Sequence, residues 1–170
     1  RPADEDLSKD SARYMDIPIT PAYAFGHGLS YAAFEYGNLQ LSGETLAPGD
    51  TFTISVDITN TSQADADEVV QLYVRDPVAQ VARPQQELRG FTRVSIAAGK
   101  TKRVAFTLRP EQFAYFAPSG QFEADAGRID FGIGAGSADI RLTGHFRMTA
   151  PVIADGPAAA LATPVSILED

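Results

Sequence analysis

The chain has 170 residues and carries 14 basic against 22 acidic side chains, a formal net charge of −8. A (β/α)₈ barrel needs roughly 250 residues and is excluded. The negative charge argues against nucleic acid or an anionic membrane surface as partner. The absence of cysteine excludes a disulfide, a thiol nucleophile and a cysteine-ligated zinc site. The sequence begins Arg1-Pro2 without a signal peptide, so we expect a processed chain or a piece of a longer polypeptide.

The first 33 residues are expected to form an extended arm or linker. Residues 1–16 are charged and poorly patterned. Pro18 and Pro21 keep the residues before them out of the α region, so this stretch is extended. Tyr23–Tyr31 then combines aromatic residues with two glycines, which predicts a turn that docks on an apolar surface. The alternative is a local aromatic plug that closes the bottom of the domain.

Residues 34–149 are predicted to be all-β. Apolar and polar residues alternate through Thr51–Asn60, the pattern of a half-buried antiparallel strand. In Glu68–Asp76 the residues Val70, Leu72 and Val74 share one fully apolar face, as in an inner strand. The full set of predicted strands is 34–41, 51–60, 68–76, 87–96, 103–108, 128–133 and 139–148.

The spacing of these segments indicates an immunoglobulin-like, antiparallel, seven-stranded β-sandwich, because turn residues separate the strands about every 8–12 residues. The immunoglobulin cysteine pair and core tryptophan are absent, so the fibronectin type III-like variant fits better. We expect strands 87–96 and 103–108 to form a hairpin, and Gly90 to mark a β-bulge. Pro110–Phe113 is predicted to be one helical turn, and 114–126 a loop. The Ala/Pro-rich stretch 150–170 is expected to be a peripheral or disordered tail.

The residues that could carry chemistry do not form a recognisable catalytic, cofactor or metal site. His145 is predicted to be a solvated strand residue, and His27 a packing or hydrogen-bonding residue. Gly132-x-Gly134-x-Gly136 lacks the lysine and helix of a phosphate loop. Asn60-Thr61-Ser62 fits a glycosylation sequon, and Asp65, Asp67 and Glu68 could bind calcium, although solvated charge is the better interpretation. The sequence therefore predicts no catalytic residue, no cofactor and no metal.

Several motifs together resemble one known module. They are Ala24–Tyr31 with Phe34, Glu68–Pro77, Arg83-Pro84, Glu87–Phe91, Ala98–Thr101, and Gly134 with Ser137–Leu142. In combination they resemble the C-terminal fibronectin type III-like domain of family 3 glycoside hydrolases, the β-glucosidase and β-xylosidase group. The departures are Ala24 for proline, His27 for tyrosine, Phe122 for tryptophan and Ala126 for proline.

This resemblance implies that catalysis and structural support belong to different domains of one enzyme. In that family the nucleophile and the acid/base carboxylate lie in a barrel and a sandwich domain, so none of the machinery is expected in this chain. The implied role is a non-catalytic accessory domain that buttresses those catalytic domains, which hydrolyse terminal β-D-glucosyl residues in a parent enzyme. The residues expected to dock there are Tyr23, Phe25, Leu29 and Tyr31. A periplasmic or secreted location is favoured for the parent enzyme.

The resemblance also implies a position for part of the arm. The stretch containing Arg13, Tyr14 and Asp16 is similar to a segment that runs along the catalytic domains, which predicts a place near the substrate entrance. An ordinary interdomain linker is the alternative. Two rival functions also remain open. One is an independent carbohydrate-binding or adhesive β-sandwich, and the other is one fragment of a nicked enzyme.

Overall fold

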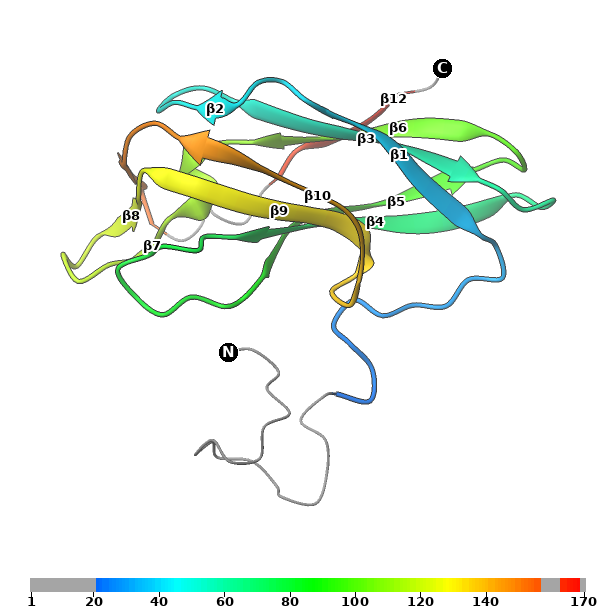
Figure 1. Ribbon diagram of the computed structural model, residues 1–170, viewed down its shortest axis with the longest axis horizontal. Helices are drawn as coiled ribbons and strands as arrows, with labels where there is room; N and C mark the ends of the chain where they lie inside the picture. Colours follow the sequence, from blue (N-terminus) through cyan, green and yellow to red (C-terminus); the bar gives the residue numbers. More distant parts are fainter. Residues whose placement is uncertain (1–20, 157–162, 169–170) are drawn as a thin grey trace.

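The computed structural model describes residues 21–156 and 163–168, and it shows a two-layer β-sandwich (Figure 1). One layer is a four-stranded sheet in the order β1-β3-β6-β12, and the other is a five-stranded sheet in the order β2-β10-β9-β4-β5. A small third sheet has the order β11-β8-β7. The longer strands are β1 Phe34–Leu41, β3 Phe52–Asn60, β4 Ala66–Arg75, β5 Glu87–Ile96, β6 Thr101–Leu108, β9 Gly127–Gly136 and β10 Asp139–Met148. The shorter elements are β2 Thr45–Leu46, the 3₁₀ turn η1 Pro110–Phe113, β7 Tyr115–Phe116, β8 Phe122–Ala124, β11 Val152–Ile153 and β12 Val165–Leu168.

The core lies between the two larger sheets and follows from the period-2 pattern of the strands. In β3 every second residue from Phe52 to Ile58 is buried, with at most 1% of its surface exposed. In β4 the predicted inner residues Val70, Leu72 and Val74 are buried opposite them. Phe146 of β10 stacks on Phe52 across the core, with 4.4 Å between ring centroids. This apolar contact between the sheets removes both inner faces from water.

All seven predicted strands and the predicted helical turn are confirmed, but the expected hairpin is wrong. Strand β5 pairs with β4, whereas β6 pairs with β3, so the connection 97–100 crosses from one sheet to the other. Asn60 at the end of β3 holds that connection, because its backbone bonds Gly99 and Lys100 at 3.0 Å. The inner residues of β5 and β6 therefore face each other across the core instead of lying side by side.

The bulge predicted at Gly90 is confirmed. Leu72 is paired with Gly90 but its neighbour Tyr73 is paired with Leu88, so Arg89 is the extra residue in β5. Glycine is required here for packing as well, since a Cβ atom at Gly90 would lie 2.8 Å from the ring of Phe106. The bulge thus lets β5 approach the opposite sheet closely.

The expectations for two connecting regions need correction. Stretch 114–126, predicted to be a loop, contains β7 and β8. The stretch 150–170, expected to be a peripheral or disordered tail, contributes two strands: β11 pairs antiparallel with β8, and β12 pairs antiparallel with β6. Thr163 also donates its hydroxyl to the carbonyl oxygen of Arg89 and accepts a 2.9 Å bond from the side-chain amide of Gln112. The apolar residues Val165 and Ile167 provide the β-propensity that an alanine- and proline-rich composition obscures.

Deletion of residues 163–170 is expected to lower the free energy of unfolding by about 1–3 kcal/mol, since the two Thr163 bonds alone contribute roughly 0.5–1.5 kcal/mol each. The deletion also exposes the edge of β6. Urea unfolding followed by circular dichroism measures the change. Deletion of residues 169–170 alone is the control. Equal stability of the two shortened chains would show that β12 contributes nothing.

Candidate docking surface

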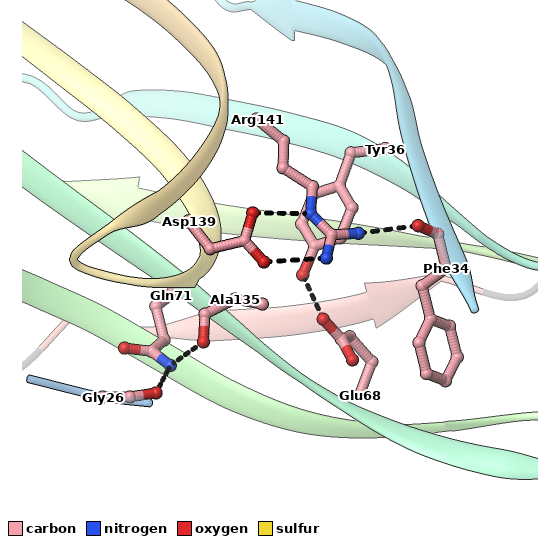
Figure 2. A network of polar contacts seen from close by, with 8 residues as sticks. All are labelled: Gly26, Phe34, Tyr36, Glu68, Gln71, Ala135, Asp139 and Arg141. Atoms are coloured by element: carbon pink, nitrogen blue, oxygen red, sulfur yellow. Dashed lines mark hydrogen bonds and ion pairs between the residues drawn. The ribbon is translucent and has the colours of Figure 1, made fainter. Parts of the chain in front are cut away.

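Residues 21–31, here called the lead-in segment, precede β1 and pass the connection between β9 and β10 (Figure 1). Backbone hydrogen bonds shape and attach this segment: His27 N–H donates to the carbonyl of Ala24 at 3.0 Å, and Ser137 N–H donates to the carbonyl of Phe25 at 3.0 Å. The side-chain amide of Gln71 donates to the carbonyls of both Gly26 and Ala135, at 3.1 and 2.7 Å (Figure 2). One side chain of β4 therefore joins the lead-in segment to β9.

The turn at Gly26 can be made only by glycine. Its φ of +75° lies in the left-handed region, and a Cβ atom there would be 2.2 Å from Gln71 Oε1 and 2.8 Å from the Tyr73 hydroxyl. Tyr73 in turn donates a 2.6 Å hydrogen bond to Gln71 Oε1, which orients the amide toward the turn. Burial raises the pKa of Tyr73, so this hydroxyl keeps its proton and remains a donor.

The lead-in segment exposes its large side chains instead of burying them. The exposed fractions are 75% for Tyr23, 66% for Phe25, 92% for Leu29 and 114% for Tyr31. The alternative of a local aromatic plug is therefore wrong for this chain. An attached segment that presents four large apolar or aromatic side chains to solvent has the character of an interaction site.

A groove of about 510 Å³ separates the lead-in segment from the outer face of β4 and β5. Phe25 and Leu29 line one side, while Val69 of β4 and Phe91 of β5 line the other. Sequence reasoning missed the second pair. The signal was weak: Phe91 is an apolar residue on the outward face of β5, next to the charged and exposed Arg93.

A polar cluster fixes the start of β1, where the lead-in segment joins the sandwich (Figure 2). The Tyr36 hydroxyl donates a 2.6 Å hydrogen bond to Glu68 Oε1, and the Arg141 guanidinium lies 4.8 Å from the centre of the Tyr36 ring. Arg141 also donates to the carbonyl of Phe34 at 2.6 Å and pairs with Asp139 at 2.9 Å. The cluster thus links β1 of one sheet to β4 and β10 of the other.

The charges in this cluster have clear electrostatic consequences. Burial, followed by the hydrogen bond to Glu68, raises the pKa of the Tyr36 hydroxyl far above its usual value. The hydrogen bond from Arg141 lowers the pKa of Asp139. These groups hold their protons and charges firmly across the neutral range, which suits a structural clamp rather than proton transfer.

The other candidates from the sequence have structural roles. His145 is exposed on β10, as predicted, and Gly132–Gly136 lies within β9 instead of in a phosphate loop. The Asn60 side chain is buried and donates to the carbonyls of Ala64 and Ile96, so the sequon asparagine is inaccessible to a glycan. Asp67 is paired with Arg93 at 2.5 Å. Within the described ranges, no group of three or more acidic or histidine side chains has the geometry to hold a metal.

Two further points concern the described part of the chain. The arm residues Arg13, Tyr14 and Asp16 lie outside the described residues. Across residues 21–156 and 163–168, a helix with the length and hydrophobicity needed to cross a bilayer is absent.

Comparison with known sequences gives a consistent result. Residues 68–137 match the fibronectin type III-like domain family. A β-glucosidase from Rhizobium radiobacter is 41% identical over 72% of this chain and 15% of its own length. A periplasmic β-glucosidase from Salmonella typhimurium is 32% identical over 81% of this chain and 18% of its length. A β-xylosidase from Formosa agariphila is 39% identical over 77% of this chain and 18% of its own length. The chain therefore spans less than a fifth of the length of these relatives.

Solved structures agree with the sequences. A β-glucosidase from Listeria innocua in complex with glucose superposes with a TM-score of 0.77 at 31% identity, over 84% of this chain and 20% of that one. A β-glucosidase from Erythrobacter marinus gives a TM-score of 0.74 at 36% identity, over 80% of this chain and 18% of that one. The sandwich described above is thus a recurring part of much larger proteins.

Substitution Gly26→Ala is expected to detach the lead-in segment, because the methyl group would collide with Gln71 and the backbone would be strained. Amide exchange at His27 and Ser137, measured by NMR, should become at least about tenfold faster, as for a locally opened segment. Gly28→Ala is the matched control, since a Cβ atom there meets nothing within 4 Å. Equal exchange in the two variants would contradict the proposed attachment.

The Tyr36 clamp is expected to weaken in alkali. A phenol whose folded pKa is raised contributes stability that is complete below its unfolded pKa of about 10 and is lost as pH rises further, by at most about 1.4 kcal/mol per pH unit. Between about pH 9 and 11 the wild-type protein should therefore lose more stability than Tyr36→Phe, as measured by urea unfolding. Tyr31→Phe, at a fully exposed site, should retain the wild-type slope. A Tyr36→Phe slope equal to that of wild type would refute the assignment.

Proposed function

We propose that this chain is the non-catalytic accessory domain of a β-glucosidase-type enzyme. It carries the fibronectin type III-like domain of glycoside hydrolase family 3, the family of β-glucosidases and β-xylosidases. Its role is to stabilise the catalytic barrel and sandwich domains by docking on them. The observation that carries this proposal is the lead-in segment, which is firmly attached to the sandwich and yet exposes four large side chains to solvent.

The energetics of the proposed docking are favourable. Burial of one large apolar or aromatic side chain contributes roughly 1.5–3 kcal/mol through area removed from water. Gln71 and the Ser137 amide already hold the segment in place, so little conformational entropy remains to be lost on docking. Tyr23, Phe25, Leu29 and Tyr31 therefore act as preformed anchors.

The parent enzyme would hydrolyse terminal β-D-glucosyl residues. This part of the proposal rests on relatives described as β-glucosidases. Arg13, Tyr14 and Asp16 would lie along the catalytic domains at the substrate entrance, and an ordinary linker is the competing role. A periplasmic or secreted location is supported by the periplasmic Salmonella relative.

An independent carbohydrate-binding module is the second candidate, and the exposed Tyr23 and Tyr31 favour it because sugars stack on aromatic faces. Affinity electrophoresis of the chain on soluble β-glucans separates the two functions. Retardation that is abolished by Tyr23→Ala and Tyr31→Ala would support the sugar-binding role, and unretarded migration supports the accessory role.

Replacing both Phe25 and Tyr31 with alanine in the full-length enzyme is expected to lower its melting temperature by at least about 2 °C. The cause is the loss of apolar contact with the catalytic domains. Differential scanning calorimetry measures the change. Phe116→Ala is the control, because Phe116 is an exposed phenylalanine on β7, at the other end of the sandwich. Unchanged melting of the double variant would reject the docking.

A further inference from the structure

We propose that the groove between the lead-in segment and strands β4 and β5 is the seat for an apolar segment of the neighbouring catalytic domain. This inference rests on the proposed function and extends it. Docking through the lead-in segment alone needs only its four outward side chains. The groove adds a second wall, Val69 and Phe91, from a different part of the chain, so that the partner is held between two walls.

Phe91 is the first reason for this assignment. It lies on β5, the edge strand of the five-stranded sheet, with 64% of its surface exposed. Edge strands of free-standing domains usually carry charged outward residues, which prevent association with other chains. Arg93, two residues later, follows that rule, whereas Phe91 does not. Val69, on the adjacent inner strand β4, is 41% exposed and lines the same groove. The apolar surface is confined to the part of the edge that faces the lead-in segment.

The dimensions and rigidity of the groove fit a protein segment. Its volume of about 510 Å³ is within the range of roughly 300–1,000 Å³ typical of binding pockets and has room for several side chains. Both walls are fixed, one by β4–β5 pairing and the other by the Gln71 amide. The groove therefore exists before the partner arrives, which reduces the entropy lost on association.

The polar groups in the groove decide what kind of partner it accepts. Glu68 accepts from Tyr36, Asp67 accepts from Arg93 and Ser95, and the Gln71 amide is bonded to Gly26, Ala135 and Tyr73. These three groups already have partners within the chain, and Ser30 accepts from the backbone N–H of Ala32, so they offer little to the hydroxyl groups of a sugar. His27 is the other polar side chain of the lining. The charged lining residues are both acidic. The groove thus favours an apolar segment without carboxylates and disfavours a polysaccharide.

The position of the groove identifies the source of that segment. The lead-in segment is both a wall of the groove and the covalent path toward residues 1–20. The relatives are several times longer than this chain, which covers 15% and 18% of two of them. A domain of the same polypeptide is tethered to the groove, which gives it a high effective concentration there. The same polypeptide is therefore a better occupant than a second copy.

Hydroxyl-radical footprinting of the full-length enzyme, with mass spectrometric readout, tests this inference. The oxidation rate of each phenylalanine is divided by its rate in the urea-unfolded enzyme. Phe91 and Phe116 are matched, since they are 64% and 62% exposed in the described domain. We expect Phe91 and Phe25 to be oxidised at least about fivefold more slowly than Phe116, because interface cores are packed like protein interiors.

The outcomes separate this inference from the proposed function. Protection of Phe25 with a Phe91 rate equal to that of Phe116 would overturn the groove assignment but leave docking by the lead-in segment intact. Absence of protection at both residues would reject both proposals. Protection of Phe91 that rises with enzyme concentration would overturn the assignment in favour of a second copy, and protection only after addition of soluble β-glucan would overturn it in favour of a sugar.

A pair of variants gives an independent readout. Phe91→Thr and Phe116→Thr both keep a β-compatible residue in a strand. In the full-length enzyme Phe91→Thr should lower the melting temperature more than Phe116→Thr, which loses only the edge contact of the Phe116 ring with Phe122. Equal melting temperatures of the two variants would count against the seat even if Phe91 were protected.

Discussion

The side-chain amide of Gln71 is the interaction on which the docking surface depends. This residue is 5% exposed and points away from the core, on the face of β4 opposite Val70 and Leu72. Its amide group bonds Gly26 and Ala135, and its oxygen accepts from Tyr73. A buried amide is stable only when such partners are present. The lead-in segment therefore supplies an acceptor for the buried Gln71 amide of β4. The same hydrogen bond holds the segment against the sheet.

This arrangement explains why the exposed side chains are compatible with a stable fold. The core is complete without them, because both large sheets bury their inner faces against each other. The Tyr36, Glu68 and Arg141 clamp joins the sheets near the point where the lead-in segment begins. The exposed apolar surface is therefore not part of an incomplete core. It is a separate surface on a domain whose own core is fully packed, as expected of a domain that docks on a neighbour.

The sequence predicted what depends on local periodicity and missed what depends on long-range pairing. Alternation in Thr51–Asn60 was sufficient to place β3, because side-chain direction has a period of two in any strand. It could not show which strand pairs with which, so β5 and β6 were wrongly joined as a hairpin although Asn60 directs them to different sheets. The strand in 163–168 was missed because four residues beside an alanine-rich stretch carry too weak a pattern. Its partner strand β6, and the residues Arg89 and Gln112 that bond the adjacent Thr163, are all distant in sequence.

The residues of the docking surface likewise differ in how far the sequence predicts them. The aromatic and glycine content of Tyr23–Tyr31 predicted a docking turn, and the family resemblance implied Tyr23, Phe25, Leu29 and Tyr31 as its docking residues. Neither could give the direction of these side chains, because a turn has no fixed period. The positive φ of Gly26 and its hydrogen bond with Gln71 fix the turn within the segment that exposes these side chains. Phe91 had a readable direction and was overlooked, since a single apolar residue on an outward face is common in monomeric proteins. What gives it meaning is its position across a groove from Phe25, a relation between residues far apart in sequence that the fold alone creates.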